Sequence, residues 1–328
     1  MFFGRLPNII MKVAIAAASG GVVGLVALRW WRSRLISSTS SAAPIALFFG
    51  PATEFIEPVR ALLKTSWEIE SVSANPAVRA EQAAAATAMI GGLAAANAML
   101  CDSGPPLKLL QCHFTGTDWL DRAAVPVGVP ICNATGQEVA IAEWVLGAML
   151  RRVDRIDEED AAMRTACAAA AAARADLGFA PPFFASPPPP TRSELSSCTV
   201  GIVGYGLIGS HVASRAAAFG CRVVATVGRA TPPRCPPELE WLGGGGQLHQ
   251  LLQESDFVVL ACPLSTKTTG LIGEVELSLM KPSAYLINIA RGPVVDEAAL
   301  YRSLKECGIG ELPSSWVVSG LCSVGSRK

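Results

Sequence analysis

The stretch from Thr199 to Gly209 reads Thr-Val-Gly-Ile-Val-Gly-Tyr-Gly-Leu-Ile-Gly, and it limits the possible folds more than any other part of the chain. A short run rich in β-branched residues stops at Gly204, and Gly204, Gly206 and Gly209 then follow at G-x-G-x-x-G spacing. A helical pattern over 210–219 and a second strand over 222–226 complete a strand–turn–helix–strand unit. This unit predicts a turn that holds the phosphates of a nucleotide.

Each glycine has its own physical role in such a turn. The first glycine allows the tight bend, the second lets backbone approach a pyrophosphate, and the third lets helix and strand pack closely. The helix that follows offers free N–H groups to the phosphates. The alternative is a glycine-rich structural turn in an ordinary α/β protein, because the spacing alone is a weak signal.

The composition excludes several classes of protein. The 328 residues are enough for two domains, and 27 basic residues balance 27 acidic ones, which argues against a nucleic-acid partner. Ten cysteines occur without any C-x-x-C pair and there are three histidines, so neither a metal site nor a disulfide framework is predicted.

The first 43 residues differ from the rest of the chain. No acidic residue precedes Glu54, whereas several arginines and a Ser/Thr-rich stretch at 37–41 do. This pattern is typical of a transit peptide for an organelle, the mitochondrion or the chloroplast. The apolar run at 13–28 is 16 residues long, shorter than the ~20 residues of a spanning helix. A signal anchor therefore stays open as the alternative.

Strands and helices alternate along most of the remaining chain, which predicts parallel sheets covered by helices. The expected strands cover 44–50, 108–112, 129–132, 199–203, 222–226, 256–261 and 284–290. The expected helices cover 57–65, 80–87, 138–153, 210–219, 248–254, 274–280 and 296–306. We expect a substrate domain over 44–157, an Ala/Pro-rich insertion or linker over 158–195, a nucleotide domain over 196–310 and a divergent tail over 311–328.

The chain resembles the D-isomer-specific 2-hydroxyacid dehydrogenases. The resemblance runs through 108–121, 129–150 and 199–229, and it is strongest over 256–304. Two blocks there carry it, Leu-Ala-Cys-Pro-Leu-Ser-Thr-Lys-Thr-Thr-Gly-Leu-Ile-Gly and Met-Lys-Pro-Ser-Ala-Tyr-Leu-Ile-Asn-Ile-Ala-Arg-Gly-Pro-Val-Val-Asp. It implies a doubly wound Rossmann domain, a flavodoxin-like α/β substrate domain, and hydride transfer between NAD(P) and a small 2-keto or 2-hydroxy acid. A homodimer is a further expectation.

The resemblance also implies site residues. Arg291 matches the arginine that binds the substrate carboxylate and carbonyl, and Gly91 with Gly92 falls where backbone N–H groups meet that carboxylate. The positions that match the cofactor site are Gly204, Tyr205, Gly206, Leu207, Ile208, Gly209, Cys262, Pro263, Thr268, Ile289 and Ala290. For Arg291 the alternative is a salt-bridging arginine, and for the glycine pair a plain turn.

The end of the second strand bears on the choice of cofactor. Members of the family that prefer NAD usually carry an aspartate there for the ribose hydroxyls, whereas this chain reads Ala-Thr-Val-Gly-Arg over 225–229. The missing carboxylate and the added cation of Arg229 predict NADP(H) tolerance or preference. The alternative is an arginine that faces solvent.

The family pattern stops near Gly308, and neither its catalytic glutamate nor its catalytic histidine has a counterpart in residues 309–328. We therefore expect a nucleotide sheet without its last strands, and a loss of about 10²–10⁴ in rate for want of the acid–base pair. Two functions stay open: a dehydrogenase acting on glyoxylate- or hydroxypyruvate-like acids, and an impaired NAD(P)-binding protein that acts through binding.

Overall fold

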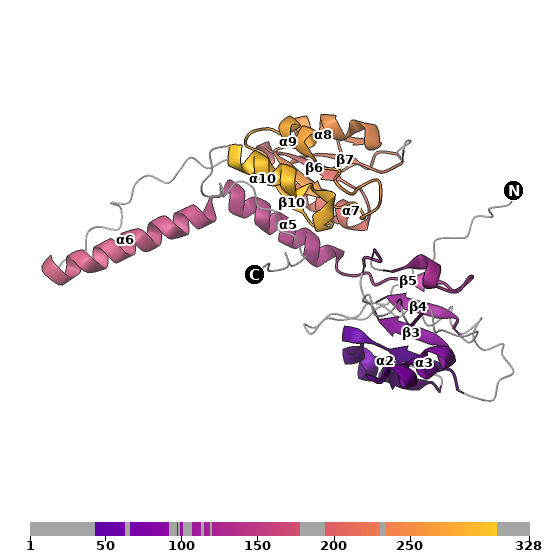
Figure 1. Ribbon diagram of the computed structural model, residues 1–328. Helices are drawn as coiled ribbons and strands as arrows, with labels where there is room; N and C mark the ends of the chain where they lie inside the picture. Colours follow the sequence, from indigo (N-terminus) through magenta and orange to yellow (C-terminus); the bar gives the residue numbers. More distant parts are fainter. Residues whose placement is uncertain are drawn as a thin grey trace. The chain divides into compact units, whose positions relative to one another are not determined.

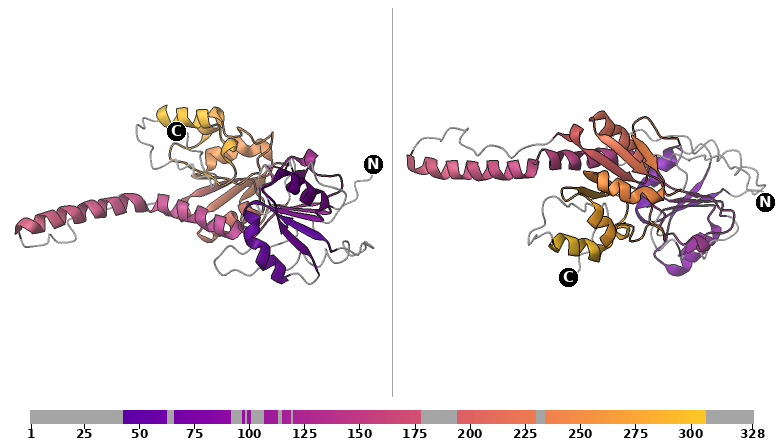
Figure 2. Two further views of the ribbon diagram at one scale, coloured as in Figure 1. Left: turned by 60° about the horizontal axis from the view of Figure 1, so that its bottom comes forward. Right: turned by 90° about the horizontal axis from the view of Figure 1, so that it is seen from above.

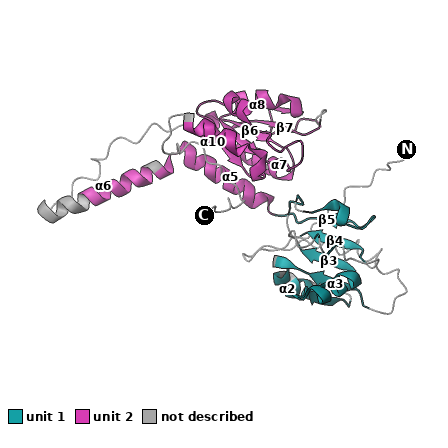
Figure 3. Cartoon of the chain, in the orientation of Figure 1, with its two compact units in different colours: residues 1–136 teal, residues 137–328 magenta. Residues whose placement is uncertain are grey.

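The computed structural model describes residues 43–62, 66–91, 97, 99–100, 107–112, 115–118, 120–177, 194–229 and 234–306. The chain forms two compact units, residues 1–136 and 137–328 (Figure 3). Several predictions lie outside the described residues: the leader with its apolar run at 13–28, Gly92, the proline-containing part of the linker at 178–193 and the tail at 311–328.

The first unit is a parallel five-stranded sheet with the order β2-β1-β3-β4-β5. This order is the flavodoxin-like one, so the expected fold of the substrate domain is confirmed. The strands are β1 (Ile45–Phe48), β2 (Glu68–Ser71), β3 (Ala88–Gly91), β4 (Leu109–Cys112) and β5 (Ile131–Cys132).

Helices cover both faces of this sheet. Helix α2 (Ile56–Leu62) packs with Phe48 and Ile90 on one face. Helix α3 (Pro76–Ala85) packs on the other face. Asn75 caps α3 because its side-chain oxygen accepts a hydrogen bond from the Ala77 N–H. Leu110 and Met89 fill the core on the α3 side.

The second unit is also a parallel five-stranded sheet, with the order β10-β9-β6-β7-β8, and Figure 1 labels β6, β7 and β10 of this sheet. Counted from β6, this is the strand order of a Rossmann sheet, which confirms the predicted doubly wound fold. The strands are β6 (Thr199–Val203), β7 (Arg222–Thr226), β8 (Trp241–Gly243), β9 (Phe257–Leu260) and β10 (Tyr285–Asn288).

The helices of the second unit lie on both faces of its sheet, as the two views of Figure 2 show. One apolar cluster joins the sheet to α5 (Glu138–Val153) and α7 (Leu207–Ala218). A second cluster joins it to α8 (Leu248–Glu254), α9 (Glu274–Leu279) and α10 (Glu297–Glu306). β6 lies at the centre and is buried along its whole length.

The division between the units differs from the boundary expected at residue 157. The structure divides the chain after Gly136, so α5 belongs to the second unit. The reason is the apolar face of α5, whose Val145, Leu146 and Met149 are buried in the same cluster as α7 and β6. The alanine-rich stretch that follows forms α6 (Ile156–Leu177), which is exposed along most of its described length.

No helix in the part of the chain that the structure describes has both the length and the apolar character needed to cross a membrane.

Candidate functional site

The glycine turn lies at the carboxyl end of β6, between the ends of β7 and β9. Its bend is fixed by the backbone N–H groups of Gly204 and Tyr205, which both donate to the Thr226 carbonyl oxygen at 3.0 and 2.9 Å. Gly206 N–H in turn donates to the Gly204 carbonyl oxygen at 2.9 Å. Three N–H groups of the turn are therefore engaged within the protein.

The N–H groups left to face a ligand are those that open α7. Gly206 is the N-cap, and Ser210 N–H makes the first hydrogen bond back to it. Helix geometry therefore leaves the N–H groups of Leu207, Ile208 and Gly209 without acceptors in the helix. Such groups, together with the positive end of the helix dipole, form an anion-binding site.

The three glycines meet different surroundings. Gly204 has a positive φ of 107°, and a Cβ there would lie 2.6 Å from the Cys262 nitrogen. At Gly209 a Cβ would lie 2.4 Å from the Gly204 carbonyl oxygen, so this glycine permits close packing of helix and strand. At Gly206 no atom lies within 4 Å of a built Cβ. The open space is therefore at the one glycine whose expected role is to admit a ligand.

Arg291 follows the carboxyl end of β10 and is half-buried. Its guanidinium donates to the Ala290 carbonyl oxygen at 2.8 Å. Asn288, which is 2% exposed, shapes the turn that carries it. The Asn288 side chain accepts a hydrogen bond from Ala290 N–H at 3.0 Å and donates to the Arg291 carbonyl oxygen at 2.8 Å. No sequence motif marks Asn288, although an amide before a strand-end turn is a common turn-forming residue.

The loop after β9 contains the other predicted cofactor positions. Cys262 is buried, and burial raises the pKa of its thiol, so it is not an activated nucleophile. The Thr268 hydroxyl donates to the Pro263 carbonyl oxygen at 2.7 Å and accepts from Ser265 N–H at 2.8 Å. Thr268 therefore fixes the shape of this loop.

Tyr205 has a partner, Glu238, that no sequence motif marks. Its phenol donates to a carboxylate oxygen of Glu238 at 2.5 Å, which ties the glycine turn to the loop before β8. Burial and this carboxylate raise the pKa of the phenol, so Tyr205 stays protonated.

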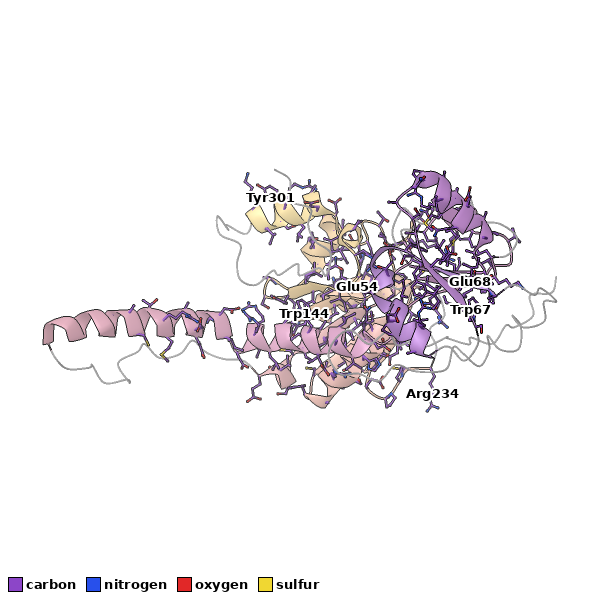
Figure 4. All side chains as sticks on the ribbon, turned by 90° about the horizontal axis from the view of Figure 1, so that it is seen from below. Glu54, Trp67, Glu68, Trp144, Arg234 and Tyr301 are labelled. Carbon is purple, nitrogen blue, oxygen red and sulfur yellow. The ribbon has the colours of Figure 1, made fainter. Side chains whose placement is uncertain are left out.

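Arg229 follows β7 and is exposed, and Arg234 is also exposed, with a side chain that extends away from the ribbon (Figure 4).

In the first unit, Gly91 ends β3. A Cβ at Gly91 would lie 2.5 Å from both the ring and the carbonyl oxygen of Phe49. Packing against Phe49 thus explains this glycine without a ligand. Among the described residues, no cluster of histidine, cysteine and acidic side chains could hold a metal ion.

The strand order, the turn at Gly204–Gly209 and the free helix N-terminus define a dinucleotide-binding α/β protein. The sequence profile described as D-isomer specific 2-hydroxyacid dehydrogenase, NAD binding domain, matches residues 148–312. The chain belongs to the D-isomer specific 2-hydroxyacid dehydrogenase family.

Similar proteins agree with this assignment. A glyoxylate reductase of Thermococcus gammatolerans is 36% identical over 62% of this chain and 58% of its own length. A glycerate dehydrogenase of Methylorubrum extorquens is 34% identical over 63% of this chain and 59% of its own. The chain thus spans less than two thirds of the length of either relative.

Solved structures show the same fold. The D-lactate dehydrogenase of Aquifex aeolicus, complexed with NAD and lactic acid, superposes with a TM-score of 0.61 at 25% identity, over 84% of this chain and 76% of that one. An acyclic imino acid reductase in complex with NADPH and D-Arg gives a TM-score of 0.62 at 23% identity, over 87% and 85%.

Proposed function

We propose that the chain binds NAD(P) at the glycine turn and transfers a hydride between the nicotinamide and a small 2-keto or 2-hydroxy acid of the glyoxylate or hydroxypyruvate kind. One observation carries this proposal: the glycine turn after β6 and Arg291 after β10 lie at the same, carboxyl edge of one parallel sheet. In such sheets ligands bind at that edge. The names of the related enzymes support the choice of substrate class.

Each residue has a proposed part in this reaction. Leu207, Ile208 and Gly209 hold the pyrophosphate through backbone N–H groups, and Cys262, Pro263, Thr268, Ile289 and Ala290 line the cofactor. When bound, the nicotinamide supplies the hydride. Arg291 holds the substrate carboxylate with its guanidinium fork and polarises the keto oxygen. For Gly91 and Gly92 of the first unit, a contact with a substrate carboxylate stays a proposal from the sequence alone.

A reduction assay tests this function directly. The full chain is mixed with glyoxylate or hydroxypyruvate and either NADH or NADPH, and oxidation of the cofactor is followed by absorbance. We expect turnover that falls by at least 100-fold in Arg291→Ala. Cofactor binding without turnover would favour the alternative function, a protein that acts through binding. Failure to bind either cofactor would refute both.

We further propose that the site accepts NADP(H). Arg229 follows β7 and is exposed, and no acidic residue lies at 226–228, so the stretch directly after β7 offers a 2′-phosphate a cation and no carboxylate of its own. Fluorescence titration should show that Arg229→Ala weakens NADPH binding about tenfold while NADH binding is unchanged. Arg234→Ala is the matched control, because it removes another exposed arginine from the segment between β7 and β8. Much tighter binding of NADH than NADPH by the unaltered chain would contradict this preference.

Residues 1–43 are proposed to direct the protein to a mitochondrion or chloroplast, on the strength of their acid-poor, Arg- and Ser-bearing composition. Fusing them to a fluorescent protein tests this localisation, and alkaline extraction of membranes tests the anchor alternative at 13–28.

A homodimer is also proposed, and light scattering of the purified chain measures its mass in solution.

A further inference from the structure

Two cysteines stand side by side at the amino-terminal edge of the nucleotide sheet. Cys198 precedes β6 and Cys221 precedes β7, and the two strands are parallel neighbours with Thr199 opposite Arg222. The Arg222 N–H continues the ladder by donating to the Cys198 carbonyl oxygen at 3.1 Å. One step back along both strands therefore places Cys198 opposite Cys221.

This position allows the two sulfur atoms to be linked. Neighbouring strands lie about 4.8 Å apart, and disulfides join residues whose Cα atoms are ~4.4–6.8 Å apart. Residues directly opposite each other in a parallel pair point to the same face. Both cysteines accordingly belong to the apolar cluster under α5 and α7, Cys221 as a buried member and Cys198 packed against it.

The two thiols donate hydrogen bonds to neighbouring backbone carbonyl groups. The Cys221 thiol donates to the Leu195 carbonyl oxygen at 3.2 Å, and the Cys198 thiol donates to the Glu194 carbonyl oxygen at 3.6 Å. These acceptors are consecutive carbonyl groups of the turn that leads into β6. Both residues are thiols here. Cys198 is half-buried, so a small reagent can reach it, whereas Cys221 is 7% exposed.

We propose that Cys198 and Cys221 are an oxidisable pair that forms a disulfide when the protein meets a thiol oxidant such as a low-molecular-weight disulfide or an azo compound. The bond would close a loop that contains β6, the glycine turn and α7. It therefore ties together the two ends of the strand–turn–helix unit from the side opposite the turn. This inference is independent of the function proposed above.

The chemistry balances with diamide as the oxidant. The Cys198 thiolate attacks one azo nitrogen and forms a sulfur–nitrogen bond. The Cys221 thiolate then attacks the Cys198 sulfur, so that a sulfur–sulfur bond forms and the sulfur–nitrogen bond breaks. Both thiol protons end on the nitrogens, which are reduced to a hydrazine by the two electrons that the thiols lose. Burial raises the pKa of the Cys221 thiol to about 11 and also raises the pKa of Cys198. Because only the thiolate form of each cysteine attacks, the reaction is run at an alkaline pH.

A second pair in the chain is a matched negative control. Cys112 and Cys132 also lie on neighbouring parallel strands, but Cys132 stands opposite Gln111 and not opposite Cys112. Because successive residues of a strand point to opposite faces, these two thiols lie on different sides of their sheet. They should therefore stay unlinked.

The experiment treats the full, folded chain with diamide at pH 9, blocks the remaining thiols and maps the peptides by mass spectrometry. We expect one major linkage, Cys198–Cys221, and alkylated Cys112 and Cys132. The oxidised protein should melt roughly 5 °C higher, because the cross-link restricts the unfolded chain. Reduction with dithiothreitol should reverse the change.

Single variants separate this bond from others. Cys198→Ser and Cys221→Ser should each abolish the linkage and the rise in melting temperature, whereas Cys235→Ser, which removes an exposed thiol, should keep both. The proposal is overturned if Cys198 and Cys221 are alkylated as fully as Cys112 after native oxidation. It is equally overturned if they link only to Cys167, Cys235 or another molecule.

Discussion

The buried side chain of Asn288 holds the backbone of Arg291 through a hydrogen bond of 2.8 Å from its amide nitrogen to the Arg291 carbonyl oxygen. Its amide oxygen accepts a second bond from Ala290 N–H. Asn288 thus fixes the turn in which the proposed carboxylate-binding guanidinium starts. It acts on Arg291 through the backbone and is a positioning residue.

Asn288→Ala should remove both hydrogen bonds and leave the Ala290 N–H without its acceptor, whereas the Arg291 carbonyl oxygen still accepts from Val294 N–H at 3.2 Å. We expect the free energy of unfolding to fall by about 2 kcal/mol, measured by urea denaturation. We also expect a higher KM for the keto acid with a smaller change in the Kd for the cofactor. Ser214→Ala on α7 is the control, since it removes an exposed hydroxyl with one local bond. An unchanged KM would show that Asn288 has a structural role only.

Alanine substitutions at Gly204 and Gly206 should distinguish an effect on stability from an effect on ligand binding. Gly204→Ala should lower the free energy of unfolding by more than about 2 kcal/mol, because φ is positive and the new Cβ would meet the Cys262 backbone. In Gly206→Ala the new methyl group meets open space, so the free energy of unfolding should change little. Its cofactor affinity should nevertheless drop at least tenfold if a pyrophosphate lies against this glycine. Thermal melts and fluorescence titration measure the two effects, and tight binding by Gly206→Ala would argue against a nucleotide at the turn.

Gln111 is a buried amide on β4 whose side-chain oxygen has no hydrogen-bond partner among the residues that the structure describes. Its nitrogen donates to the Cys112 carbonyl oxygen at 2.8 Å. Because an unpaired buried carbonyl costs more than one such bond contributes, Gln111→Met should raise the free energy of unfolding by about 1 kcal/mol. Gln82→Met is the matched comparison and should lower it, since Gln82 bonds Ser73, Glu70 and Ser71. A loss of stability in Gln111→Met would mean that the amide oxygen does have a partner.

The sequence predicted the fold well wherever strands were long and their ends were marked. The predicted bounds of β6, β7, α5 and α8 agree with the structure, because glycine turns and apolar spacing delimit them. Three strands were missed, β2, β3 and β8, and β3 follows directly after the helix expected over 80–87. Glu68–Ser71 carries two acidic residues, and Trp241–Gly243 is three residues long and runs into a glycine series. Both are held by pairing with a neighbouring strand, which no local pattern reveals.

The backbone turn of the candidate site could be predicted from the sequence, whereas the hydrogen-bond partners of its side chains could not. The glycine spacing points to the turn directly, since each glycine answers a local steric need. The partners Asn288 and Glu238 depend on contacts across a turn or between loops distant in sequence, as Tyr205 and Glu238 illustrate. The place of α5 in the second unit likewise depends on which sheet its apolar face meets, and that is decided by tertiary packing.

Arg222, the first residue of β7 in the nucleotide sheet, should make stability depend on pH. Its guanidinium binds Glu240 and Glu254 at 2.6 Å each. The hydrogen bond from Arg222 lowers the pKa of Glu240, and bonds from Gln250 and then Arg222 lower that of Glu254. Since both pKa values are lower in the folded state, the stabilisation is present above the ordinary glutamate pKa, about 4.3. It is lost as the pH falls through the lowered values.

The melting temperature of Arg222→Met should therefore lie below that of the unaltered chain at pH 6, and the gap should close as the pH falls below about 4. The pairs are partly exposed, so high salt should narrow the gap at pH 6 as well. Arg164→Met on α6 is the control, because Arg164 pairs with Asp160 on a largely exposed helix and should change the melting temperature little at any pH. A gap for Arg222→Met that is the same at pH 3 and pH 6 would show that Arg222 stabilises the edge through packing of its methylene groups and not through its charge.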